Sequence, residues 1–232
     1  LKGRLDIAHP YFPYSMTGFE YGMLGVSLFG SGYGLENLGY IAVADLGHEL
    51  FIWTFFLAML LRKRDSLNGP GQLAQAFMRS PVLISIIAGI VLNLLGAQDF
   101  LYESVVTGGV IATMDFLGNL TIPLILMIVG AGIKLDMQRM REAGQVIGLR
   151  LVLLIPLVLL INAIIVRELL DLEEGFEAAL FTLFILPPPF IIPLYMRSDS
   201  VEERRYINNI LMLYTVVTIV IFTIYLAINP NI

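Results

Sequence analysis

The chain contains no cysteine, two histidines and one tryptophan among its 232 residues, and it carries little charge. The absence of cysteine excludes disulfides, thiolate metal sites and cysteine nucleophiles. Charged residues make up 14% of the chain, whereas soluble domains contain about 25%. No cluster of basic residues suggests a nucleic acid as partner. Hydrophobic residues instead make up 57%, with a mean hydropathy of +0.82, which indicates a protein whose solvent is the lipid bilayer.

Apolar stretches of about 20 residues are long enough to cross a bilayer as helices. The sequence contains seven of them, so it predicts an all-α integral membrane protein with seven transmembrane helices. Residues 62–80 form a cytoplasmic linker in this scheme. The predicted spans are 14–33, 37–61, 81–98, 105–133, 146–166, 178–196 and 206–228.

The charges between these spans predict the orientation. Of the 14 lysines and arginines, all except Arg167 fall on one side of the membrane. Basic residues concentrate on the cytoplasmic side, so we expect a multi-pass protein of the cell membrane with its amino end inside and its carboxyl end outside. A seven-helix receptor would have the opposite orientation. A retinal protein is also excluded, because the last span contains no lysine.

The most informative stretch is Leu186 followed by Pro187–Pro189, with Pro193 nearby, inside the predicted span 178–196. Proline lacks the backbone N–H and clashes with the preceding turn, so a helix must break here. Lipid cannot satisfy the freed carbonyl groups. Many secondary transporters use such broken helices to build substrate and ion sites. The alternative is a kinked helix whose carbonyls are satisfied by neighbouring helices.

Three groups of short motifs occur in order along nearly the whole chain. The first is Tyr21–Phe29 (YGMLGVSLF), the second is Ser80–Ile84 with Thr121–Leu124 and Gly130–Gly132, and the third is the Leu186-Pro187 break. This ordered set resembles the auxin efflux carrier family of permeases, in its bacterial type. The resemblance implies ten spans in two inverted five-span repeats, each with a broken fourth span, and the two breaks cross near mid-membrane.

By this resemblance the seven spans are the fourth to the tenth, and three more are expected to precede Leu1. Residues 1–61 would be the remainder of the first repeat, with the broken helix 14–33 and helix 37–61. Residues 81–232 would be the complete second repeat, with the broken helix 178–196. The first break (18–27) would cross the second (186–193).

The resemblance implies a secondary transporter that moves a small organic solute, a carboxylate, by alternating access, with no cofactor and with a homodimer contact. This sequence departs from the family at Glu20, where asparagine is usual, and at Ser27, where proline is usual. The first break would then rely on Gly18, Gly22 and Gly25 for backbone freedom. The substrate-binding positions carried over are Glu20, Tyr21, Gly25, Ser27, Leu186, Pro187, Pro188 and Pro189.

Ionisable residues inside the spans need an explanation, because a charge in lipid costs roughly 3 kcal/mol or more. Asp45, His48 and Glu49 have spacings of three and four, which place them on one helix face. Together with Glu20 they are candidates for coupling transport to H⁺ or Na⁺, since histidine titrates near neutral pH. The alternatives are a buried polar network for Asp45, His48 and Glu49, and an interfacial side chain reaching water for Glu20.

Other functions fit less well. His48-Glu49 matches the start of a zinc-protease motif, but the second histidine would have to stand where Ile52 stands. Asp45 and Asp115 lack the glycine-flanked surroundings of an aspartyl protease, so we expect no catalytic residues and no metal. A non-transporting receptor or assembly protein stays open, although it leaves the proline break unexplained. A structural role is expected for Asp115, Asn119, Thr121, Asn93, Asn162, Asn208, Asn209, Tyr214 and Thr215.

Overall fold

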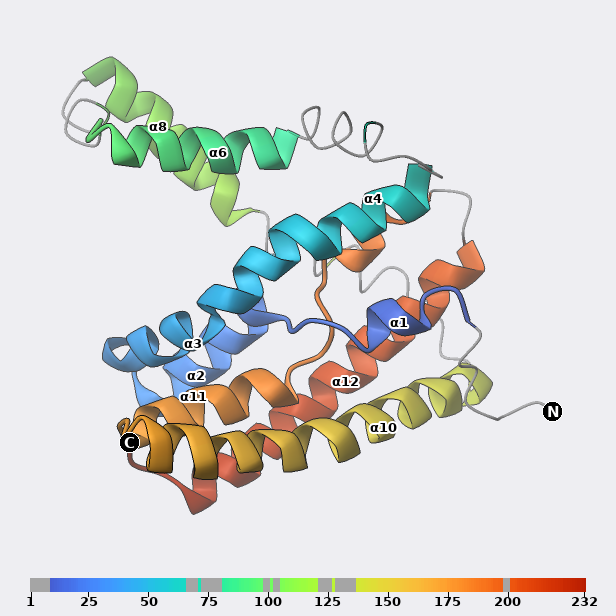
Figure 1. Ribbon diagram of the computed structural model, residues 1–232. Helices are drawn as coiled ribbons and strands as arrows, with labels where there is room; N and C mark the ends of the chain where they lie inside the picture. The colour runs from blue at the N-terminus through green and yellow to red at the C-terminus, as the bar shows by residue number, and fades with distance from the viewer. Residues whose placement is uncertain are drawn as a thin grey trace. The chain divides into compact units, whose positions relative to one another are not determined.

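A computed structural model describes residues 9–65, 71, 81–97, 101, 105–120, 127, 137–197 and 201–232. Within these residues every regular element is helical (Figure 1). The elements are α1 (Phe12–Ser15), a π-helix (Tyr21–Gly25), α2 (Val26–Tyr33), a 3-10 turn (Leu35–Asn37), α3 (Leu38–Phe51), a π-helix (Ile52–Phe56), α4 (Leu57–Asp65), α6 (Pro81–Leu94), α8 (Val105–Asn119), α10 (Met137–Ile161), a π-helix (Asn162–Leu169), α11 (Glu174–Ile185), a 3-10 turn (Ile192–Tyr195) and α12 (Val201–Ile228).

Three of the described helices are long and apolar enough to cross a membrane. They cover Leu35–Asp65, Met140–Leu169 and Val201–Ile228. Their outward side chains are apolar and open: Val152 is 71% exposed and Ile224 is 56% exposed. Rows of exposed aliphatic side chains on long helices suit a lipid environment. These helices therefore support the expectation of an all-α membrane protein.

The three long helices coincide with predicted spans 37–61, 146–166 and 206–228. The spans 14–33 and 178–196 are not continuous helices, in keeping with the breaks expected there. The first part of span 105–133 is α8, and most of the remainder lies outside the described residues. Seven spans, the inverted repeat and the division at 61 and 81 stay predictions.

The chain divides into two compact units. Unit one comprises residues 1–52 and 129–232, and unit two comprises residues 53–128. Unit two contains α4, α6 and α8, and the described apolar side chains of α6 and α8 are largely exposed, as Leu94 and Phe116 illustrate. Unit one holds α1 to α3 and α10 to α12, and it contains every candidate site residue discussed below.

The core of unit one forms where α2, α3, α11 and α12 pack together. Phe29 of α2, Ile41 of α3, Leu183 of α11 and Phe222 of α12 are buried in one cluster. Helix α10 lies along α12 and also contacts α11 (Figure 1). This packing fixes the ends of α2 and α11, and with them the two places where the helices are interrupted.

Candidate functional site

The second interruption lies where the prolines predict it. Helix α11 ends at Ile185, and Leu186 follows in an extended conformation with φ −67° and ψ 151°. A residue that precedes a proline favours this extended region, and the prolines themselves cannot donate helical hydrogen bonds. Regular structure resumes only at the 3-10 turn that begins at Ile192. The expectation that the helix breaks near Leu186 is confirmed.

The first interruption is shorter than predicted. Helix α1 ends at Ser15, and the next helical residue is Tyr21. Gly18 has φ +74°, in the left-handed region that favours glycine. Gly22 and Gly25, by contrast, are helical, so the expectation that they supply backbone freedom is wrong. Gly25 serves a different need, because a Cβ there would lie 2.9 Å from Leu186 Cδ1.

The two interruptions lie against each other. The backbone N–H of Glu20 donates to the carbonyl of Pro187 at 2.9 Å. In the opposite direction, the N–H of Phe190 donates to Glu20 Oε2 at 2.5 Å. A Cβ on Gly18 would lie 2.8 Å from the ring of Pro189, so the backbone at Gly18 packs against this ring more closely than any other residue would permit. Segments 16–20 and 186–190, which we call the paired breaks, therefore form one structural feature.

Glu20 is the polar centre of the paired breaks. Its side chain is buried, with the residue 5% exposed, which contradicts the alternative of a side chain that reaches water. Oε1 accepts from the N–H of Met23 at 3.3 Å, and Glu20 thus caps the helix that begins at Tyr21. Because Oε2 accepts from Phe190, the carboxylate binds backbone donors of both breaks.

Carbonyl groups freed by the prolines find partners within the protein. Thr218 Oγ1 of α12 donates to the carbonyl of Ile185 at 2.7 Å. The carbonyl of Leu183 accepts from the N–H of Leu186 at 3.1 Å. A neighbouring helix that satisfies such a carbonyl is what the alternative of a kinked helix predicts, although the sequence did not identify Thr218 as the partner. The available signal was the presence of three threonines, Thr215, Thr218 and Thr223, in a long apolar helix.

Arg150 of α10 also joins the two breaks, although the sequence indicated only a basic residue of the inner side. Its residue is 1% exposed. One terminal nitrogen donates to the carbonyl of Ser15 at 3.0 Å, and the other donates to the carbonyls of Gly18 and, at 3.5 Å, Leu186. The signal that could have revealed it is an arginine surrounded by apolar residues inside the predicted span 146–166.

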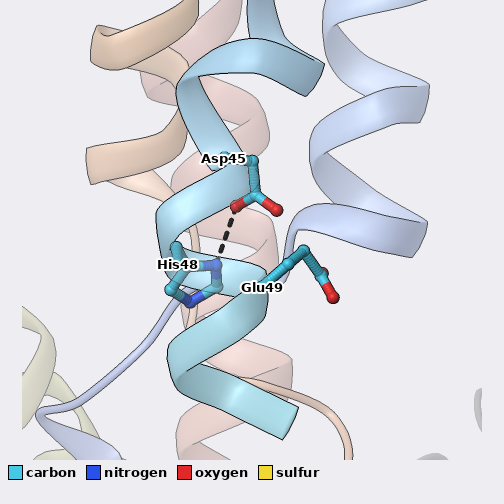
Figure 2. Close-up of side chains that lie close together, drawn as sticks. All are labelled: Asp45, His48 and Glu49. Carbon is cyan, nitrogen blue, oxygen red and sulfur yellow. Dashed lines mark hydrogen bonds and ion pairs between the residues drawn. The ribbon is translucent and has the colours of Figure 1, made fainter. Parts of the chain in front are cut away.

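Asp45, His48 and Glu49 project together from α3, as their spacing predicts (Figure 2). His48 Nε2 accepts a hydrogen bond from the backbone N–H of Phe19 at 2.8 Å. Nε2 therefore uses its lone pair, and the proton of the neutral ring is on Nδ1. Nδ1 lies 2.7 Å from Asp45 Oδ1 and donates to it. Through His48, α3 is thus linked to the first interruption.

The same cluster retains acceptor capacity. The ligand atoms of Asp45, His48 and Glu49 all lie within 4.8 Å of one another. Both nitrogens of His48 are already engaged, so a metal ligand role for His48 would break an existing hydrogen bond. Asp45 Oδ2 is buried and has no hydrogen-bond partner within the described part of the chain. The two carboxylates, one turn apart, can accept a proton or a small cation that prefers oxygen ligands.

The other predicted residues lie in different surroundings. Pro187 and Pro189 contact the first interruption, as does Leu186 through its contact with Gly25. Ser27 is exposed, and its hydroxyl donates to the carbonyl of Met23 within its own helix. Tyr21 packs against the hydrophobic core of unit one. The side chains of Asp115 and Asn119, and all of Thr121, lie outside the described residues.

Asn162 behaves as the structural residue that the sequence predicts. Its Nδ2 donates to the carbonyl of Glu177 at 3.0 Å and joins the end of the long α10 segment to α11. Glu177 also pairs with Arg167 through two hydrogen bonds. These contacts lie at the end of α11 opposite the proline break, so they hold α11 in place from its other end.

Comparisons of the chain with protein-family models, with curated proteins and with solved structures found no match. The likeness to auxin efflux carriers therefore rests on the motifs of the sequence alone.

Proposed function

We propose that this protein is a membrane permease of the auxin efflux carrier type. It would be a secondary transporter that moves a small organic solute, a carboxylate, across the cytoplasmic membrane by alternating access. The observation that carries the proposal is the contact of two helix interruptions through Glu20, Pro187 and Phe190. Irregular backbone at membrane depth is tolerated only where protein or water surrounds it. Transporters place such interruptions where substrates and coupling ions bind.

A simple proline kink is a weaker explanation. It would account for the end of α11 but not for a second interruption at 16–20 that packs against it. It also does not account for the ionisable groups gathered there, since Glu20 and Arg150 are both buried. Burying a charge costs several kcal/mol. A function that uses charge explains this cost better than packing does.

The proposed transport is coupled to a cation, either H⁺ or Na⁺. Asp45 Oδ2 and the Glu49 carboxylate supply oxygen atoms for it, and Glu20 is the acidic group of the paired breaks. An ionised Glu20 would repel a carboxylate, so an accompanying cation would offset that repulsion. His48 connects the two places, because it bonds both Asp45 and the backbone of Phe19. Binding of a cation at Asp45 would then bias the geometry of the first interruption.

The proposal retains the orientation and assembly expected from the sequence. The amino end lies inside, the carboxyl end lies outside, and two copies form a dimer. No cofactor takes part. Spans that carry the paired breaks would move, and the spans of residues 81–133 would be static.

The test is uptake by proteoliposomes that contain the purified full-length protein. Radiolabelled acetate, benzoate and succinate serve as anionic probes, and methylammonium serves as a cationic probe. Each is measured with an imposed pH gradient, with a Na⁺ gradient and with neither, beside liposomes without protein. We expect uptake of at least one anion that depends on one of the two gradients.

The outcomes separate the alternatives. Uptake that is independent of both gradients would leave a transporter and refute cation coupling. If folded protein carries none of the probes, the receptor or assembly function becomes the better explanation. Selective uptake of methylammonium would reverse the proposed charge of the substrate.

A further inference from the structure

Arg150 is a buried cation whose counter-charge does not come from a carboxylate. The groups that it bonds are the carbonyls of Ser15, Gly18 and Leu186. In the described residues no ion pair joins it to an acidic side chain. The buried carboxylates of unit one are engaged elsewhere, since Glu20 binds backbone N–H groups and Asp45 binds His48. Carbonyl dipoles only partly compensate a full charge at a site with so little water.

One donor of this cation and one donor next to it have no acceptor. Arg150 Nε and the hydroxyl of Tyr214 are both buried and both lack a hydrogen-bond partner within the described ranges of the chain. They come from neighbouring helices, α10 and α12, which pack along each other (Figure 1). The guanidinium carbon lies 5.6 Å from the centre of the Tyr214 ring. The hydroxyl oxygen and the guanidinium also lie close enough to interact with each other.

Unsatisfied buried donors are rare in native proteins, because each costs about 1–3 kcal/mol. A ligand that brings negatively charged oxygen atoms would satisfy both donors and complete the charge balance. Arginine is suited to this role, because its terminal nitrogens can hold the backbone carbonyls while Nε is left to donate to a carboxylate oxygen. The ring of Phe19 lies on the guanidinium as well, with its centre 5.3 Å from the guanidinium carbon. That contact shields the cation from competing water.

We propose that Arg150 and Tyr214 form an anion-binding subsite that receives a carboxylate group of the transported solute. The donors at the paired breaks do not serve this purpose in this chain, because Glu20 already occupies them. Arg150 places the anion next to both interruptions, since the same guanidinium holds carbonyls from each.

The subsite rests on the proposed function in one respect. Arg150 and Tyr214 are buried in the conformation seen here, at 1% and 0% exposure. An external anion reaches them only if unit one opens, and alternating access supplies that opening. The rival explanation is that Arg150 is a structural clamp that holds the two breaks together and binds no ligand.

The experiment measures anion binding directly, apart from transport. Equilibrium dialysis of the purified full-length protein in detergent uses acetate and succinate, with acetamide and succinamide as uncharged counterparts. Tyr214→Phe removes only the hydroxyl, and Tyr225→Phe on the same helix is its matched control. Arg150→Lys keeps the charge and removes the planar fork. Melting temperatures show that each variant is folded.

We expect wild type and Tyr225→Phe to bind one of the anions and neither amide. Tyr214→Phe should weaken binding about tenfold, the effect of losing one hydrogen bond to a charged group. Arg150→Lys should weaken it at least as much. A clamp alone predicts no change in affinity for folded Tyr214→Phe.

Three results would overturn the subsite: a wild type that binds neither anion, equal binding of the amides, or unchanged affinity in both Tyr214→Phe and Arg150→Lys. Anion binding that depends on Tyr214, in a protein that carries no solute in proteoliposomes, would retain the subsite and refute the transporter. Anion uptake that Tyr214→Phe and Arg150→Lys leave unchanged would retain the transporter and refute the subsite.

Discussion

His48 Nε2 accepts a hydrogen bond from the backbone N–H of Phe19 at 2.8 Å. This bond joins the middle of a long membrane-length helix to an interruption 29 residues earlier in the chain. The N–H of Phe19 is a part-buried donor outside any helix, and a fully buried donor without a partner costs about 1–3 kcal/mol. The other ring nitrogen of His48 donates to Asp45, so the imidazole ring alone connects Asp45 with the backbone of Phe19.

Two substitutions of His48 separate its two bonds. Glutamine places its carbonyl oxygen near the position of Nε2, so His48→Gln retains an acceptor for the N–H of Phe19. Asparagine reaches only as far as Nδ1, so His48→Asn retains the donor to Asp45 and loses the bond to Phe19. We expect hydrogen exchange of the 16–23 segment to stay slow in His48→Gln and to accelerate in His48→Asn. Equal acceleration in both variants would show that the Phe19 bond is not what orders this segment.

Gly18 and Gly22 give a matched pair for the backbone at the first interruption. Gly18 has φ +74°, and a Cβ would lie 2.8 Å from both Ile52 Cδ1 and Pro189 Cγ. Gly22 is helical, and a Cβ there meets no atom within 4 Å. Gly18→Ala should therefore lower the free energy of unfolding by more than about 1 kcal/mol, and Gly22→Ala should raise it by about 0.4–1 kcal/mol.

Unfolding of the full-length protein in mixed micelles measures both glycine variants. The two variants are compared by the sign of the difference between their free energies of unfolding. A Gly18→Ala variant as stable as Gly22→Ala would mean that the left-handed turn and the close approach to Pro189 do not form in solution.

Local chemistry explains which parts of this arrangement could be predicted. Proline interrupts a helix, and spacings of three and four residues define a helix face. The break at Leu186 and the shared face of Asp45 and His48 could therefore be predicted from the sequence. Contacts between residues far apart in the chain could not be predicted. Phe190 bonds Glu20 across 170 residues, and Arg150 bonds Ser15 across 135. Nothing in either neighbourhood specifies such a partner.

The predicted extent of the first break is wrong for a related reason. Glycines at 22 and 25 suggested flexible backbone, yet a glycine permits helix as well as a turn. The carboxylate of Glu20 decides between them, because it caps the N–H of Met23 and so starts a helix at Tyr21. The cap is visible in the sequence as an acidic residue just before an apolar run.

Replacing Glu20 by glutamine tests the carboxylate itself. The amide keeps one acceptor oxygen and loses the charge, so one of the two backbone donors, Phe190 or Met23, loses a charge-assisted hydrogen bond. We expect a loss of about 1–3 kcal/mol in stability and solute uptake that no longer responds to the imposed gradient. Glu168→Gln, an exposed residue, is the control. Gradient-dependent uptake of normal size in Glu20→Gln would restrict Glu20 to a capping role.

Residues 1–232 contain no cysteine, so a thiol introduced there is the only one in this stretch and makes its orientation directly measurable. Asp171 is exposed in the acidic segment before α11, and Glu202 is exposed in the first turn of α12. Since basic residues gather on the cytoplasmic side, we expect a membrane-impermeant maleimide to label Asp171→Cys in intact cells. Glu202→Cys should react only after the membrane is permeabilised. The reverse pattern would invert the topology, and labelling of both residues from outside would mean that the segment between them, including the proline break, does not cross the membrane.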